Sequence, residues 1–200
     1  TTLNLAEQAA SAGVKRFVFL SSIKVSGEAS HPNQPLQPND IINSNSPIIK
    51  KKDPYAISKL ECERGLQNIS FRSRMGVVII RPPLIYGSGV KGNFCSLLKL
   101  TKFSLPLPLK GIENKRSLVF VKNLVSLIMV VLEHPDADGE IFLVSDDNDV
   151  STSRLIKILY SKSGRKAKLF KLPRIFFMIL LNLMGKGGIY DRLFKNLEVD

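Results

Sequence analysis

The chain has 200 residues, of which 44% are hydrophobic and 23% are charged. This composition suits a folded domain and excludes a disordered tail, a collagen-like chain and a low-complexity array. The 29 basic and 17 acidic residues give a net charge of +12, which favours an anionic partner. The two cysteines, Cys62 and Cys95, are too few for a disulfide-stapled secreted scaffold and predict free thiols in a reducing compartment, the cytoplasm.

Helix and strand patterns alternate along the first ninety residues. Apolar residues at helical spacing predict a helix that a glycine ends, over 3–13, and a continuous apolar run predicts a buried strand at 17–20. A long loop rich in Pro, Asn and Ser covers 27–54. Asp53–Pro54 then marks the start of a helix, and 77–80 form a second buried strand.

The second half of the chain continues this alternation. It predicts a helix at 94–103, a loop at 105–115 and an extended segment at 117–120. A helix at 124–134, a strand at 141–144 and a helix at 151–161 follow. Strands that alternate with helices predict an α/β fold built on a doubly wound parallel sheet. The Gly-rich turn that opens the first βαβ unit of such a sheet, G-x-G-x-x-G, is absent from the sequence. We therefore expect the chain to be cut from a longer protein.

Tyr55 and Lys59 are four residues apart in the helix that begins at Pro54, so their side chains share one face. Tyrosine has an ordinary pKa of about 10, and a neighbouring ammonium favours the phenolate, the form that acts as a base. Ser21 and Ser22 follow the first strand and would lie at the carboxyl end of the sheet, where open α/β sheets bind ligands. Taken alone, the Y-x-x-x-K spacing is more often a solvated pair on a helix surface.

Three segments give this spacing a context. They are FLSSIKVSGE at 19–28, DPYAISKLECE at 53–63 and VVIIRPPLIYGSG at 77–89. In order and spacing they closely resemble the extended short-chain dehydrogenase/reductase family, and in particular its nucleotide-sugar epimerases and dehydratases. The resemblance covers nearly the whole chain.

The resemblance implies two parts. The first is the C-terminal portion of a Rossmann-type NAD(P)-binding domain, at 1–90, whose sheet also uses about 117–147. The second is a small, mainly helical substrate-binding lobe, at 91–116 and 148–200. The isolated segment would have no turnover, because the unit that cradles the cofactor pyrophosphate is missing.

The resemblance also implies roles for single residues. Ser22, Tyr55 and Lys59 would be catalytic, with Tyr55 as the acid/base and Lys59 on the ribose hydroxyls of the cofactor. The cofactor would be NAD, with NADP as the open alternative. The residues that line it would be Leu20, Ser21, Tyr55, Lys59 and Pro82.

A nucleotide sugar would be the substrate. Ser22 and Tyr55 would contact the reacting sugar hydroxyl, and Asn93 would touch the sugar or its diphosphate. Arg116 would grip the diphosphate, because a guanidinium binds phosphate through two parallel hydrogen bonds. A helix cap remains the alternative for Asn93, and a surface charge for Arg116.

The sequence departs from the family pattern at two places, and one of them bears on the type of reaction. Leu84 stands where several relatives carry a substrate-binding asparagine, and Ile23 and Lys24 stand where dehydratases carry an Asp–Glu pair. The second departure argues against 4,6-dehydration. The resemblance thus implies a UDP-hexose 4-epimerase of surface polysaccharide biosynthesis. Two alternatives stay open: an NAD(P)H-dependent 4-keto-sugar reductase of the same family, and an inactive truncated remnant that only binds a partner.

The stretch 151–190 carries nine basic residues and no acidic residue, and it contains the apolar run 175–181. That run is shorter than the about 20 residues needed to cross a bilayer. It is either a helix of the substrate lobe buried on one side, or a peripheral helix that contacts an anionic membrane surface. The sequence predicts no nucleic-acid interface and no metal site. A homodimer, common among relatives, is a further expectation.

Overall fold

A three-stranded parallel sheet forms the centre of the computed structural model, which describes residues 1–42, 53–90, 93–103, 105–183 and 187–200. The strands are β1 (Arg16–Leu20), β2 (Gly76–Arg81) and β5 (Ile141–Leu143), in the order β1-β2-β5. Phe17 pairs with Val77, and Ile79 pairs with Ile141. This arrangement confirms the predicted α/β class with a parallel sheet.

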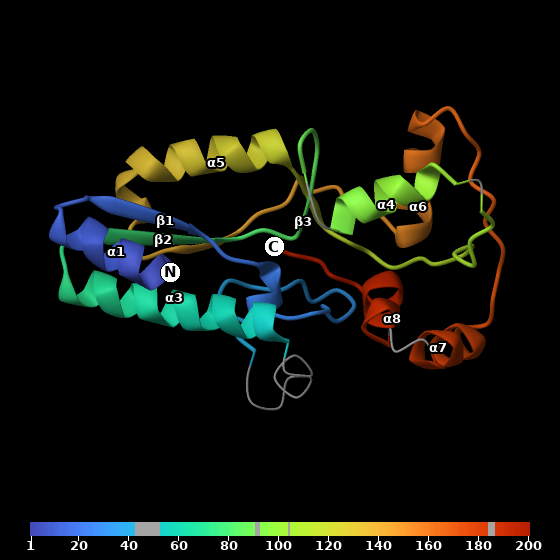
Figure 1. The fold of residues 1–200 in the computed structure, drawn as a ribbon, viewed down its shortest axis with the longest axis horizontal. Helices are drawn as coiled ribbons and strands as arrows, with labels where there is room; N and C mark the ends of the chain where they lie inside the picture. The colour runs from blue at the N-terminus through green and yellow to red at the C-terminus, as the bar shows by residue number, and fades with distance from the viewer. Residues whose placement is uncertain (43–52, 91–92, 104, 184–186) are drawn as a thin grey trace.

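Helices cover both faces of the sheet (Figure 1). On one face α1 (Thr2–Ser11) and α3 (Pro54–Arg72) pack against Val77 and Ile79, and on the other α5 (Val121–Glu133) packs against Val78 and Ile80. Successive side chains of a strand point to opposite faces, so both sets must be apolar. This is why the strands are continuous apolar runs rather than alternating ones.

Local signals set the ends of these helices. Gly13 has a φ of 76°, and its N–H donates to the carbonyl of Ala10 at 3.1 Å, which closes the last turn of α1. At the start of α3 the Asp53 carboxylate accepts from the backbone N–H of Tyr55 and Ala56, at 3.1 and 3.3 Å. Both ends lie where the sequence predicted them.

A second, two-stranded parallel sheet extends from the first. It pairs β3 (Leu84–Tyr86) with β4 (Leu118–Phe120). The sequence predicted the extended segment at β4 but no strand at β3. Three residues after a Pro-Pro pair are too short to show a period, and their partner lies far along the chain.

Four helices gather beside this small sheet (Figure 1). They are α4 (Asn93–Thr101), α6 (Thr152–Lys162), α7 (Arg174–Leu183) and α8 (Gly187–Phe194). Buried side chains of α6 and α7, including Ile156, Tyr160 and Phe177, form a core that is separate from those of the central sheet. The patterns at 94–103 and 151–161 predicted α4 and α6, whereas α8 was not predicted.

Candidate functional site

The chain leaves the carboxyl end of β1 through Ser21 and Ser22 while it stays paired with β2. Ser21 N–H donates to the carbonyl of Ile80 at 2.8 Å, and Ile23 N–H donates to that of Pro82 at 3.1 Å. The Ser22 hydroxyl accepts from the backbone N–H of Lys24 at 3.3 Å and starts the short 3-10 helix η1 (Ile23–Val25). The sheet therefore fixes both serines at the edge where its strands end.

The first two turns of α3 place Tyr55 and Lys59 beside this edge. The Lys59 ammonium donates to the carbonyl of Leu20, the last residue of β1, at 2.7 Å. The same nitrogen lies 5.9 Å from the centre of the Tyr55 ring, which keeps 51% of its surface exposed. The structure thus brings the tyrosine, the lysine and the end of β1 together, with the ring open to a ligand.

Lys24 is a second cation at this place, and its role was not visible in the sequence. Its ammonium also lies 5.9 Å from the centre of the Tyr55 ring, and it forms an ion pair with Asp53. Burial alone would raise the pKa of Asp53. The hydrogen bonds from Lys24 and from the backbone N–H of Ala56 and Tyr55 outweigh it, so this pKa lies below its ordinary value. The carboxylate that caps α3 thus also holds Lys24 beside the tyrosine.

A buried arginine anchors the loop that follows η1. Arg81, at the end of β2, donates to both carboxylate oxygens of Glu63 on α3, at 3.0 and 2.7 Å. It also donates to the Ser26 hydroxyl at 3.0 Å and to the carbonyls of Pro38 and Asp40 at 2.9 and 3.1 Å. One guanidinium therefore ties β2, α3 and this loop together behind the serines.

Asp146, which follows β5, joins the two-stranded sheet to α5. Asp146 accepts from the hydroxyl of Tyr86 at 2.8 Å, from the side-chain amide of Asn123 at 2.8 Å and from the backbone N–H of Phe120 at 3.0 Å. The hydrogen bond to this carboxylate raises the pKa of Tyr86. These bonds join the end of β3 to the start of α5.

Arg116 lies just before β4, where three segments meet. Its backbone pairs with Val150 in both directions at 3.1 Å, and it also forms a bridge to Leu197. Burial, and then the positive charge of Arg192 on α8, lower the pKa of Arg116 to about 10, so it is still protonated at neutral pH. The Arg116 guanidinium also donates to the backbone carbonyl of Lys195 at 3.4 Å. No local sequence pattern relates Arg192 to Arg116, because the two residues lie far apart in the chain.

The structure gives fewer details for two other predicted site residues, Pro82 and Asn93. Pro82 is buried directly after β2. Asn93 is the first residue of α4, and its side chain lies outside the described residues.

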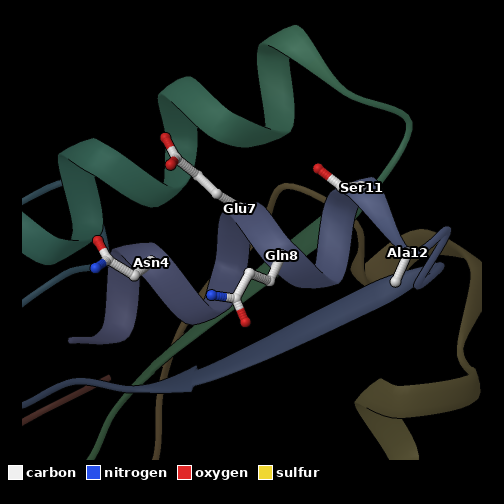
Figure 2. A pocket seen from close by; sticks show the side chains of 5 residues that line it. All are labelled: Asn4, Glu7, Gln8, Ser11 and Ala12. Atoms are coloured by element: carbon white, nitrogen blue, oxygen red, sulfur yellow. The ribbon is translucent and has the colours of Figure 1, made fainter.

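A separate open hollow lies on the outer surface of α1. Figure 2 shows the side chains that line it: Asn4, Glu7, Gln8, Ser11 and Ala12. None of the predicted site residues is among them. Glu7 also forms an exposed ion pair with Arg72 of α3 at 3.6 Å. The hollow offers no group arranged for chemistry.

The model of the NAD dependent epimerase/dehydratase family matches residues 1–145. The chain belongs to this family. A curated UDP-glucose 4-epimerase from Vibrio cholerae is 43% identical over 200 residues, which are 100% of this chain and 59% of that protein. The chain thus spans little more than half the length of that relative.

Solved structures of family members share the fold. A UDP-glucuronic acid 4-epimerase from Bacillus cereus in complex with NAD matches 85% of this chain and 54% of its own, with a TM-score of 0.69 and 20% identity. A UDP-glucose 4-epimerase from Thermotoga maritima with UDP-glucose matches 100% of this chain and 59% of its own, with a TM-score of 0.69 and 19% identity. These neighbours show a Rossmann-type fold for the chain.

Proposed function

We propose that the protein is a nucleotide-sugar 4-epimerase that uses bound NAD and acts on a UDP-hexose. The observation that carries this proposal is the half-exposed Tyr55 ring, whose centre lies 5.9 Å from two ammonium groups, beside the serines that follow β1. The Vibrio cholerae relative supports the choice of reaction and nucleotide.

The residues present fit the nicotinamide half of the cofactor. The Ser21 hydroxyl is buried and has no hydrogen-bond partner among the described residues, which is costly unless a ligand supplies one. Next to it Leu20 keeps 40% of its surface exposed and can lie against a ring. Lys59 would hold the ribose hydroxyls, and Pro82 would contribute to the wall behind the nicotinamide.

The bound cofactor would supply the chemistry of accepting and returning a hydride at the sugar carbinol carbon. Tyr55 would take the proton of the sugar 4-hydroxyl through its phenolic oxygen and give a proton back when the hydroxyl is restored. Lys59 and Lys24 would hold positive charge near the reacting tyrosine, since both ammonium groups lie 5.9 Å from the centre of its ring. The Ser22 hydroxyl would hold the sugar oxygen in place by a hydrogen bond.

The substrate diphosphate would lie between the central sheet and the helices beside it. Arg116 and Arg192 provide two guanidinium groups for its oxygens, and their mutual repulsion would be relieved by a bound anion. We assign 91–116 and 148–200 to the substrate lobe, with Asn93 at the sugar end. The segments 1–90 and about 117–147 would belong to the NAD-binding domain.

Turnover and cofactor use test the proposal in the protein that carries these residues at its full encoded length. We expect it to interconvert UDP-glucose and UDP-galactose without net consumption of NADH. Tyr55→Phe should lower kcat by at least about a hundredfold while NAD binding is kept. Tyr160→Phe, which removes a hydroxyl bonded to the Phe103 carbonyl in the separate helical core, should stay within a few-fold of the parent protein.

Other outcomes would replace the proposal. Stoichiometric NADH consumption with a 4-keto sugar would identify a reductase instead. Absence of turnover with both cofactors would overturn the enzyme assignment in favour of a binding protein. Near-normal turnover of Tyr55→Phe would remove that residue from the mechanism.

Two further points belong to the same proposal. We place the reaction in the cytoplasm, where it would supply sugars for surface polysaccharide, since a reducing compartment suits the free thiols of Cys62 and Cys95.

We also propose a homodimer through the outer face of α1 and α3, where Leu5 and Phe71 are exposed by 59% and 93%. Sedimentation equilibrium of Phe71→Ser against the parent protein tests the dimer, since the variant should be more monomeric.

A further inference from the structure

Helix α7 has two apolar faces, of which only one is buried. Phe177 and Leu181 are 6% and 8% exposed, and Phe177 packs edge-on against the Phe194 ring of α8 at 5.1 Å. Each residue turns a helix by about 100°, so Ile175, Phe176, Ile179 and Leu183 fall on the side opposite this pair. The helix therefore presents a second apolar stripe, away from its own core.

The second stripe is open to solvent. Ile175, Phe176, Ile179 and Leu183 keep 54%, 60%, 48% and 82% of their surfaces exposed. An exposed contiguous stripe of large apolar side chains marks an interaction surface. In Figure 1 α7 lies at the opposite end of the molecule from α1 and β1. The stripe is thus separate from both the candidate site at the end of β1 and the hollow on the surface of α1.

A cationic segment leads into this helix. From Lys162 to Arg174, both included, the chain has six basic residues, and no acidic residue occurs anywhere from 151 to 190. The segment is held in place, because Phe170 N–H donates to the carbonyl of Leu107 at 3.0 Å and Lys110 N–H donates to that of Phe170 at 3.1 Å. The positive charge is therefore fixed beside the N-terminal end of the stripe.

A hollow of about 310 Å³ lies at this same end of α7. Lys110, Lys171 and Arg174 line it, and none of its lining residues is acidic. Phe194 forms part of the wall, with the Arg174 guanidinium 5.8 Å from the centre of its ring. The hollow lies toward the covered side of α7, where Phe194 packs, while the apolar stripe runs along the opposite side of the helix. Three cations around a concave surface at the N-terminal end of this helix match lipid phosphates that lie level with the helix while the stripe faces the acyl chains.

We propose that α7 and the cationic hollow bind the protein to the surface of a bilayer that contains anionic phospholipid. The apolar stripe would enter the boundary between headgroups and acyl chains, and Lys110, Lys171 and Arg174 would contact lipid phosphates. The contact is peripheral, since none of the helices within the described ranges is long and apolar enough to cross a membrane. Charge and shape favour lipid over a second copy of this chain, because two such faces would bring like charges together.

Co-sedimentation with lipid vesicles tests this proposal on the protein at its full encoded length. We expect binding to vesicles of phosphatidylcholine and phosphatidylglycerol in equal parts, weak binding to phosphatidylcholine alone, and loss of binding at high salt. Phe176→Ser with Ile179→Ser should weaken binding at least about tenfold, because two large apolar side chains no longer insert. Lys171→Gln with Arg174→Gln should weaken binding to the mixed vesicles and leave binding to phosphatidylcholine unchanged.

A matched control separates this effect from general surface hydrophobicity. Met129→Ser on α5 removes an apolar side chain that is 59% exposed, close to the 60% of Phe176, and should leave vesicle binding unchanged. Equal binding of the Phe176→Ser/Ile179→Ser variant and the parent protein would overturn the proposal. Absence of binding of the parent protein to mixed vesicles would also overturn it. So would a dimer of the parent protein that dissociates in the Phe176→Ser/Ile179→Ser variant, because a second copy of the chain would then cover the stripe. Sugar epimerisation is not needed for any of these measurements.

Discussion

Replacing Arg81 by methionine removes the guanidinium that holds the loop after η1 against the sheet. The Arg81 and Glu63 side chains are 0% and 3% exposed, so the substitution leaves the Glu63 carboxylate buried without its counter-ion. It also removes the donors to Ser26 and to two backbone carbonyls. Loss of one partner of a buried pair costs about 3–5 kcal/mol, and we expect Arg81→Met to lower the free energy of unfolding by this amount.

Urea denaturation followed by circular dichroism measures this loss. Arg72→Met is the matched control, since Arg72 and Glu7 form a pair at 3.6 Å with side chains 65% and 60% exposed. Exposed pairs of this kind contribute about 0–1 kcal/mol. The double replacement Arg81→Met/Glu63→Met should be less costly than Arg81→Met alone, because no charge is left buried. If Arg81→Met costs no more than Arg72→Met, the guanidinium is not the anchor inferred from its contacts.

Two further predictions concern the start of α3 and the turn after β3. The lowered pKa of Asp53 means that its ion pair with Lys24 stabilises the fold above the ordinary aspartate pKa of about 4, and this contribution is lost as pH falls through the lower folded value. Urea midpoints of the parent protein and Asp53→Asn should therefore differ most near neutral pH and converge in acid, and a gap that is constant with pH would contradict this. Gly87→Ala should destabilise by about 1–3 kcal/mol in thermal unfolding, because φ is 133° and the added Cβ would lie 2.6 Å from a methyl carbon of Val121. Gly89→Ala, with a φ of 79° but open space around it, should cost less, and an equal cost would remove the clash from the explanation.

The sequence alone was sufficient for features that depend on neighbouring residues. Continuous apolar runs predicted β1 and β2, and Asp53 and Gly13 predicted the helix ends that the structure shows. The spacing of Tyr55 and Lys59 placed both on one face of α3, where the structure has them. These signals work because helix periodicity, caps and strand patterns are decided within a few residues.

Only the tertiary structure decided which distant residues meet at the candidate site. Lys24 meets Asp53 and Tyr55, Arg81 is buried against Glu63, and the charge of Arg192 acts on Arg116. Such pairs follow from the order of the strands and the packing of helices on them, which no local period contains. The sequence of α7 likewise does not determine which of its two apolar faces is buried. Its sequence is apolar almost all round, and only the positions of Phe194 and the other helices determine which face is covered.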